Sequence, residues 1–286
     1  MVMIYSTTIL SKSKYVPVAK NYYAVREEWT KLSRRARHLD MCACVASRRK
    51  HLIFTGQSAC SIYDIPRLDA FEMRPNCISK KVKGTSDIIR WHHETHDPHA
   101  RKVKELLVAS PIQAIFDLAK YDTPESLLVS INHCLFSKLF NVNEFASEIS
   151  DRPGIIGIKL LRRLLRFANE KCESPLETIA WIALYKTGFV LPQLQVDIFE
   201  NHKFVGCVDM YWELRDRIVV IELDGNIKYE VGNDLLREKK REENIRRTGC
   251  EVYRADWTEV KSGEFVQLLE KIGIPKRRHF VGTFPK

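Results

Sequence analysis

Several features that would assign a function at once are missing from this sequence. Its eight cysteines form no CxxC pair, and there is no HExxH motif, glycine-rich phosphate loop, internal repeat or low-complexity segment. The uncharged apolar runs are far shorter than the roughly 18–20 residues that a membrane helix needs. The first ten residues lack a basic segment, unlike a secretory signal. These absences predict a cytoplasmic protein with reduced thiols and no membrane contact.

Length and charge point to two different halves. The 286 residues favour two domains, because one domain usually has about 100–200 residues. Residues 1–172 hold 28 Lys and Arg against 17 Asp and Glu, whereas residues 173–286 hold 18 against 19. A positive field on one domain favours polyanions, nucleic acid above all. The alternative is a soluble protein that is simply basic.

The stretch from Phe204 to Gly225 predicts a β-hairpin with a charged turn at Arg215-Asp216. In that register Asp209 lies opposite Glu222, and alternation adds Asp224 to the same face. The other face is expected to carry Val208, Met210, Trp212, Val219, Ile221 and Leu223. Like charges this close repel, and a hard divalent cation is their usual neutraliser. The hairpin therefore predicts a Mg²⁺ or Mn²⁺ site, with a solvated sheet face as the alternative.

The first half predicts a mixture of strands and helices. Residues 4–18 are expected to form a short hairpin and residues 23–49 one long helix. Two further helices should begin at Ser110-Pro111 and Thr123-Pro124, which have the pattern of an N-cap followed by proline. The run 91–99 holds four histidines, but a proline interrupts it, so it predicts a polar loop better than a metal site.

A basic helix is expected at residues 158–171. Its charged stripe consists of Lys159, Arg162, Arg163 and Arg166. We expect these arginines to face phosphate groups. The stripe is equally consistent with the solvent side of a linker helix.

The second half has a regular order of elements. Ser174 and Glu177 have capping-box spacing at the start of a helix. After it we expect a strand at 194–199, the hairpin, a charged helix at 234–247, a strand at 250–254 and a helix at 258–272. The order αβββαβα predicts a mixed sheet flanked by helices. The expected fold class is therefore α/β (α+β), with domains at residues 1–170 and 171–286.

These motifs together resemble the PD-(D/E)XK, or restriction-endonuclease-like, superfamily. The similarity is greatest to a branch related to very-short-patch repair endonucleases, found in actinobacterial AbiEi-like antitoxin proteins. It rests on ESPLE (173–177), VGCVDMYW (205–212), IELDGNIKY (221–229) and REKKREENIRRTGCEVYR (237–254). The first half resembles the AbiEi-like region through TGQSACSIYDIP (55–66) and SPIQAIFDLAK (110–120).

Two departures from the family pattern are visible. The family often begins with a winged helix, which is expected to be truncated or absent here, because Tyr15-Val16-Pro17 stands where that module would end. The third position of the (D/E)xK motif is Asp224, where the pattern calls for lysine.

The resemblance implies a DNA endonuclease in which a metal-activated water attacks a backbone phosphate. The implied catalytic residues are Glu177, Asp209, Glu222, Asp224, Lys228 and Lys239, and the phosphate-binding residues are Arg237 and Arg241. Asp209, Glu222 and Asp224 would hold Mg²⁺ or Mn²⁺. Glu177 as a helix cap, and the charges of the 234–247 helix as surface ion pairs, are the structural alternatives.

Two functions without catalysis remain open. One is a DNA-binding, antitoxin-like regulator of a bacterial toxin–antitoxin or phage-defence system that keeps the nuclease fold as a scaffold. The other is a module that binds a cognate toxin. The missing lysine favours a regulator, and the three carboxylates favour an enzyme. The oligomeric state is not predicted.

Overall fold

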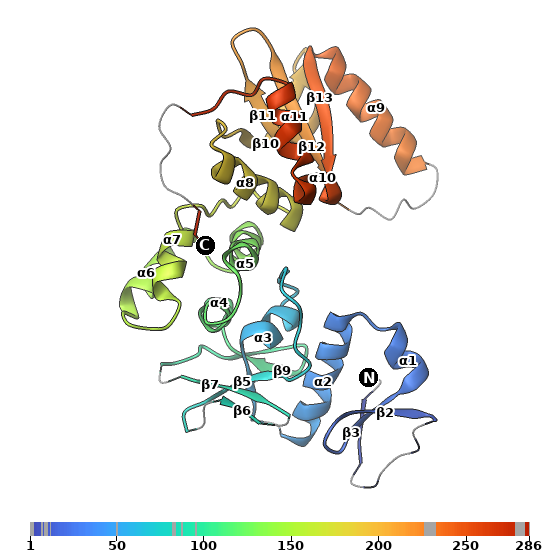
Figure 1. Ribbon diagram of the computed structural model, residues 1–286, viewed down its shortest axis with the longest axis vertical. Coiled ribbons are helices and arrows are strands. Elements are labelled where there is room, and N and C mark those ends of the chain that lie inside the picture. The colour runs from blue at the N-terminus through green and yellow to red at the C-terminus, as the bar shows by residue number, and fades with distance from the viewer. Residues whose placement is uncertain are drawn as a thin grey trace. The chain divides into compact units, whose positions relative to one another are not determined.

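A computed structural model describes the chain except residues 1, 2, 7, 9, 10, 12, 50, 82, 83, 87, 95, 226–232, 278–283 and 286, and except the side chains of 84, 85 and 233–238. Helices and sheets are mixed, in agreement with the predicted α/β class (Figure 1). The chain divides into two compact units, residues 1–166 and 167–286. Within the described residues, no helix has the length and apolar character to cross a membrane.

Unit 1 begins with a three-stranded antiparallel sheet in the order β1-β3-β2. Its elements are β1 (Met3–Tyr5), β2 (Tyr15–Ala19), β3 (Tyr22–Val25), α1 (Arg26–Lys31) and α2 (Arg34–Arg48). The predicted hairpin at 4–18 is wrong, because β1 and β2 each pair with β3. The predicted single helix at 23–49 is also wrong. Its first three residues belong to β3, whose sequence Tyr-Tyr-Ala-Val has the aromatic and β-branched character of a strand. Ser33 starts α2 by accepting a hydrogen bond from the Ala36 N–H at 3.1 Å.

A mixed six-stranded sheet follows in the order β6-β7-β5-β4-β9-β8. Its strands are β4 (Ile53–Phe54), β5 (Asn76–Ser79), β6 (Gly84–Thr85), β7 (Arg90–His93), β8 (Arg101–Val103) and β9 (Leu106–Val108). The helices of this part are α3 (Gly56–Ile62), α4 (Pro111–Leu118), α5 (Pro124–Phe136), α6 (Val142–Asp151) and α7 (Ile158–Leu164). The expected caps are confirmed, since Ser110 and Thr123 accept from backbone N–H groups of α4 and α5.

The histidine-rich run is only partly a loop. His92 is buried in β7, where its Nε2 lies 2.7 Å from Asn76 Oδ1 and its Nδ1 lies 3.3 Å from Asp117 Oδ1. The side chains of His93 and His99 are exposed. The run thus contributes one buried histidine to the core of unit 1.

Unit 2 holds a four-stranded sheet in the order β10-β11-β12-β13. Its strands are β10 (Gln193–Glu200), β11 (Lys203–Glu213), β12 (Ile218–Asp224) and β13 (Cys250–Asp256), and its helices are α8 (Pro175–Thr187), α9 (Asn233–Arg247), α10 (Trp257–Ser262) and α11 (Glu264–Lys271). The first three strands are antiparallel, and β13 runs parallel to β12 after the crossover through α9. The predicted last helix is two helices, separated at Gly263, whose φ of 90° interrupts the helix.

Both faces of this sheet are covered (Figure 1). One core packs α8, α10 and α11 against Met210, Trp212, Val219, Ile221 and Leu223, as the alternation predicted. The other core joins Ile245 of α9 to Val220 and Val252. Val208 belongs to this second core, so its predicted place beside Met210 is wrong. Burial on both faces explains the nearly continuous apolar run of β12.

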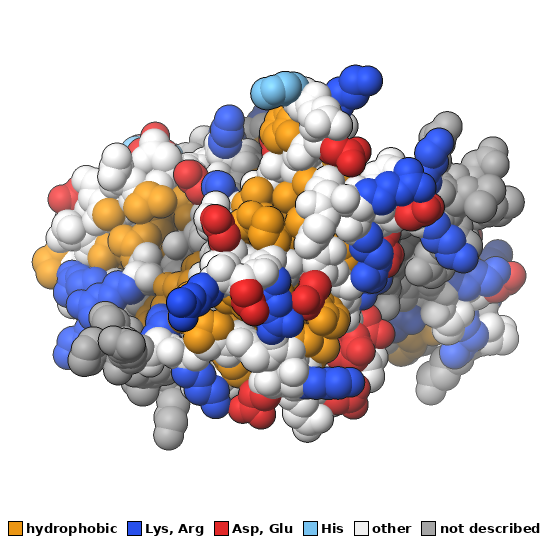
Figure 2. All heavy atoms as spheres, turned by 90° about the horizontal axis from the view of Figure 1, so that it is seen from above, with side chains coloured by type: hydrophobic (Ala, Val, Ile, Leu, Met, Phe, Trp, Pro, Cys, Tyr) orange, Lys and Arg blue, Asp and Glu red, His pale blue; other side chains and the backbone are white. Residues whose placement is uncertain are grey.

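The charge excess belongs to unit 1. Residues 1–166 hold 27 Lys and Arg against 16 Asp and Glu, and residues 167–286 hold 19 against 20. Figure 2 shows one face of the molecule, where Lys and Arg side chains lie among Asp and Glu side chains and hydrophobic patches. A net positive charge on unit 1 attracts polyanions.

The core assignment of unit 2 can be tested with two phenylalanines. Phe265 of α11 is fully buried, whereas Phe204 of β11 is 61% exposed. We expect Phe265→Ala to lower the free energy of unfolding by about 3–5 kcal/mol, because it leaves a cavity. Phe204→Ala should change it by less than about 0.5 kcal/mol. Urea denaturation followed by circular dichroism measures both, and similar losses in the two variants would contradict this core.

Candidate functional site in unit 2

The central hairpin has the register that the sequence predicts. Met210 pairs with Ile221 and Glu213 with Ile218, and the Leu214 N–H donates to the Arg217 carbonyl across the turn. Continuing the register by one residue places Asp209 beside Glu222. The Glu222 side chain is close enough to the Asp209 carboxyl to influence its pKa. The predicted acidic pair is therefore present, on neighbouring strands of the sheet.

Asp209 takes a backbone hydrogen bond with its side chain. Its Oδ2 accepts from the Leu223 N–H at 2.7 Å, and its Oδ1 accepts from Gln195 Nε2 at 3.3 Å. Regular pairing of β11 with β12 ends at Met210, next to this residue. Burial raises the pKa of the Asp209 carboxyl above its usual range, although these hydrogen bonds act in the opposite direction. The group is thus held in place and half-buried.

Glu222 is 6% exposed and carries its own counter-charge. Arg241 Nη1 lies 3.1 Å from Glu222 Oε1 and also donates to the Cys207 carbonyl at 2.9 Å. Gly206 lies beside the Arg241 side chain, and a Cβ there would make an ordinary van der Waals contact with Arg241 Cγ at 3.4 Å. Arg241 was predicted to hold phosphate, but in the structure it neutralises an acid of the site.

Glu177 is the third acid of the cluster and is 5% exposed. The Ser174 hydroxyl caps α8 by accepting from the Glu177 N–H at 3.1 Å. A reciprocal capping box would direct the Glu177 carboxylate to the Ser174 N–H, whereas its Oε2 accepts from the Glu173 N–H at 2.9 Å and from Gln195 Nε2 at 3.0 Å. Burial raises the pKa of Glu177. The cap alone therefore does not account for this glutamate.

Gln195 joins these acids and was not predicted. Its single amide nitrogen lies within hydrogen-bonding distance of both Glu177 and Asp209, and its Oε1 accepts from the Cys207 thiol at 3.4 Å. Its φ of +51° is unusual within a strand. A polar residue in the middle of β10 is the only sequence signal for it, and that signal does not show which acids it meets.

Asp224 is not part of this cluster. It is 35% exposed and forms an ion pair with Arg254, whose Nη1 lies 3.1 Å from Asp224 Oδ2. Arg254 also contacts Glu242 of α9 at 2.9 Å. The expected three-carboxylate face thus becomes Asp209 and Glu222 with Glu177 nearby. The reason is β13, which pairs alongside β12 and supplies Arg254 as a cation for Asp224.

The remaining predicted residues are distributed as follows. Lys239 lies on α9 with an exposed side chain. Lys228 and the side chain of Arg237 fall outside the described residues. Arg162, Arg163 and Arg166 lie in unit 1, and their side chains are exposed, which suits either phosphate or solvent. Across the described part of the chain, no group of three or more His, Cys, Asp or Glu side chains is arranged to hold a metal ion.

Comparison with known proteins identifies relatives without assigned functions. The chain is similar to two uncharacterised proteins of Mycobacterium tuberculosis, from strains CDC 1551 and H37Rv, each 25% identical over 158 residues. The aligned region covers 55% of this chain and 57% of each relative, so it spans only about half of their length. No family model matches the chain. No solved structure matches it either.

The buried acids predict a measurable pH dependence. A raised pKa means that the folded state binds a proton more tightly than the unfolded state, so stability falls as the pH rises from about 4 through the raised pKa. We expect Asp209→Asn to raise the free energy of unfolding at pH 7 by roughly 0.5–2 kcal/mol, since buried charge is removed. Near pH 4 the gain should disappear.

Urea denaturation at several pH values measures this effect. Asp216→Asn is the matched control, because Asp216 lies exposed in the hairpin turn. Asp209→Asn could instead lower the free energy of unfolding by the same amount at pH 7 and at pH 4. That result would show that the charge of Asp209 does not cost stability in the folded state.

Proposed function

We propose that unit 2 hydrolyses phosphodiester bonds of nucleic acid, with DNA as the substrate. The observation that carries this proposal is the adjacency of the half-buried Asp209 to the buried Glu222, with Glu177 joined to Asp209 through Gln195. Buried acids with raised pKa values are more typical of functional sites than of solvated sheet faces. The solvated-face alternative does not account for their burial.

The order of elements in unit 2 supports the same proposal. One helix, three antiparallel strands, a crossover helix and a parallel fourth strand follow one another. This is the arrangement expected of a restriction-endonuclease-like domain. The acidic pair lies on the two central strands, where the PD-(D/E)XK resemblance places it. A fold supports many functions, so the proposal depends on the acids and not on the order alone.

The donor chemistry of the pair fits a hard divalent cation. Mg²⁺ is commonly held by one or two carboxylates together with water and substrate phosphate oxygens. Asp209 and Glu222 supply such a pair, and their proximity and burial favour a positive partner. When bound, Mg²⁺ or Mn²⁺ would lower the pKa of a coordinated water and polarise a phosphoryl oxygen. A third ligand from the protein is not required by this chemistry.

The chain's own residues would then have separate roles. Asp209 is oriented by the Leu223 N–H, and Glu177 and Gln195 are positioned to accept and donate hydrogen bonds to a water beside it. Arg241 supplies positive charge at Glu222. Lys239 and Lys228 remain proposed cations for the transition state, because Asp224, which occupies the usual lysine position, pairs with Arg254.

Metal binding tests this proposal without a choice of substrate. Calorimetric titration of the full chain with Mn²⁺ at neutral pH should show binding that weakens at least tenfold in Asp209→Ala and in Glu222→Ala, since each change removes one ligand of the pair. Asp224→Ala should change the affinity less than about threefold, because this carboxylate is half-exposed, is held by Arg254 and is not one of the two proposed ligands. Asp216→Ala serves as the control for a lost surface charge.

Cleavage of duplex DNA with Mg²⁺ or Mn²⁺ completes the test. Loss of cleavage in Asp209→Ala, with circular dichroism unchanged, supports catalysis at this site. A folded wild-type protein that binds no Mn²⁺, with or without DNA, would refute the enzymatic proposal.

A second function is favoured by a different observation. Glu222 and Asp224 are both paired with arginines of the same unit, which suits an antitoxin-like DNA-binding regulator that uses the fold as a scaffold. This proposal predicts duplex affinity that falls steeply with salt, without cleavage. Fluorescence anisotropy at two salt concentrations measures it, and salt-independent or absent binding contradicts it. Binding of a cognate toxin stays a prediction.

A further inference from the structure

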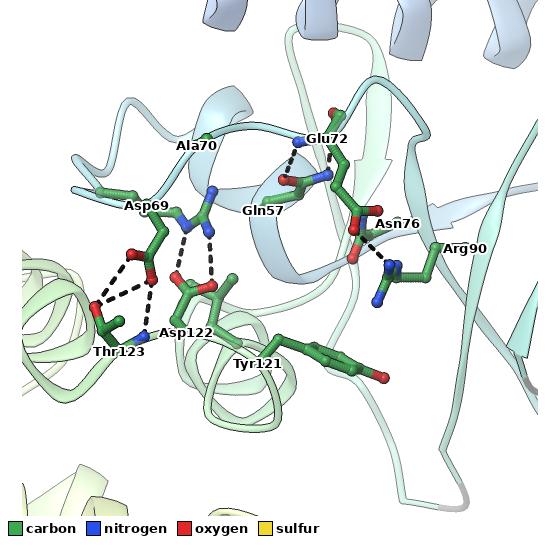
Figure 3. A pocket seen from close by; sticks show the side chains of 11 residues that line it. Gln57, Asp69, Ala70, Glu72, Asn76, Arg90, Tyr121, Asp122 and Thr123 are labelled. Atoms are coloured by element: carbon green, nitrogen blue, oxygen red, sulfur yellow. Dashed lines mark hydrogen bonds and ion pairs between the residues drawn. The ribbon is translucent and has the colours of Figure 1, made fainter. Parts of the chain in front are cut away.

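Unit 1 contains a polar pocket that the function proposed for unit 2 does not use. It has a volume of about 220 Å³. Figure 3 shows its walls, which include Asn76 and Arg90 of the six-stranded sheet and Tyr121, Asp122 and Thr123 of the segment between α4 and α5. The loop after α3 closes it through Arg67, Asp69 and Glu72. This volume suits one planar ring system better than a drug-sized ligand.

The pocket is held in shape before any ligand arrives. Arg67 and Asp122 form a bidentate ion pair at 2.6 and 2.8 Å, and their side chains are 3% and 5% exposed. Asp69 accepts from both the N–H and the hydroxyl of Thr123, as the dashed lines in Figure 3 indicate. Because these side chains are already fixed, less conformational entropy would be lost when a ligand binds.

Two donors of the pocket are left without acceptors. Within the described residues, Arg67 Nη1 and Arg90 Nε are buried and have no hydrogen-bond partner. A buried unsatisfied donor is costly, so such an atom calls for an explanation such as a ligand. Both nitrogens belong to residues that line the same pocket. A ligand that presents acceptor atoms would suit the two guanidinium groups of this pocket.

An exposed aromatic ring forms one side of the pocket. Tyr121 is 61% exposed, and the Arg90 guanidinium lies 4.9 Å from its ring centroid. The ring of His92 meets Tyr121 edge-on at 5.8 Å and helps to fix it. Exposed aromatic rings beside arginine are typical platforms for stacking a base.

The charge balance selects among planar ligands. Asp69, Glu72 and Asp122 outnumber Arg67 and Arg90, which disfavours a simple anion such as phosphate. The Glu72 side chain is 48% exposed and can accept from a ligand. Guanine offers O6 and N7 as acceptors for arginine, and its N1–H and N2–H₂ groups are adjacent donors for a carboxylate. We propose that this pocket binds a guanine base.

The base can come from a free guanine nucleotide or from a nucleic-acid strand with an extruded base. Both sources present the same ring to the pocket. The excess of 27 basic over 16 acidic residues in unit 1 would assist the second source through its phosphates. The experiment therefore includes one arm for each source.

Calorimetry on the full chain provides the first arm. GMP should bind at least tenfold more tightly than AMP, CMP or UMP. Among the four bases, only guanine combines the O6 and N7 acceptors for arginine with the N1–H and N2–H₂ donors for a carboxylate. Ribose 5-phosphate should not bind. Equal affinity for all four nucleotides, or binding of ribose 5-phosphate comparable to that of GMP, would overturn the proposal.

A single-stranded pentanucleotide with one central guanine provides the second arm. Tighter binding than GMP, lost when adenine replaces the guanine, supports a nucleic-acid source. Binding no tighter than that of GMP supports a free nucleotide. Absence of binding by both GMP and the pentanucleotide would overturn the proposal.

Variants connect either result to the pocket. Tyr121→Ala and Arg90→Gln should each weaken guanine binding at least tenfold. Phe136→Ala, at a ring 40% exposed on α5 and outside the pocket, is the control for the first. Arg101→Gln is the control for the second, since Arg101 forms a similar contact with Tyr63 elsewhere in unit 1. Unchanged binding in both pocket variants, with both controls normal, would overturn the assignment of the site.

Discussion

A buried glutamate beside a half-buried aspartate is the constraint on which the centre of unit 2 depends. An uncompensated buried ion costs several kcal/mol, and two like charges raise that cost. The protein offsets it with the Leu223 N–H, the Gln195 amide and the Arg241 guanidinium, and the pKa of Asp209 rises because burial disfavours its charged form. A proton, an arginine or a metal ion can supply the balancing charge, so the same geometry serves a catalyst or a scaffold.

The surrounding structure follows from this compensation. Gln195, which joins Glu177 to Asp209, has a positive φ within its strand. Apolar cores lie on both faces of the sheet that carries the acids. In a drier environment each of these polar contacts is electrostatically stronger. These hydrogen bonds thus hold the acids in position, and burying their charge costs stability.

Unit 1 holds a buried polar cluster around Asp117 beside the pocket. Burial by itself would raise the pKa of Asp117, but His92 and Lys120 outweigh it and hold that pKa well below its usual range. Thr55 donates to the same carboxylate at 2.6 Å, so every partner has a structural role. In the adjacent pocket, Arg67 Nη1 and Arg90 Nε lack acceptors among the described residues. The Asp117 carboxylate thus has several partners within the fold, whereas Arg67 and Arg90 each keep one nitrogen without an acceptor.

The sequence by itself determined the features that depend on nearby residues. The α/β class, the hairpin register that places Asp209 beside Glu222, and the caps at Ser110, Thr123 and Ser174 all follow from local patterns. Only the tertiary structure decided that Arg254 takes Asp224 out of the site, that Arg241 neutralises Glu222 and that Gln195 joins the acids. The partners of these contacts lie 14–30 residues apart in the chain. Local periodicity predicts the face on which a side chain lies, whereas its partner depends on strands and helices that meet only when the chain has folded.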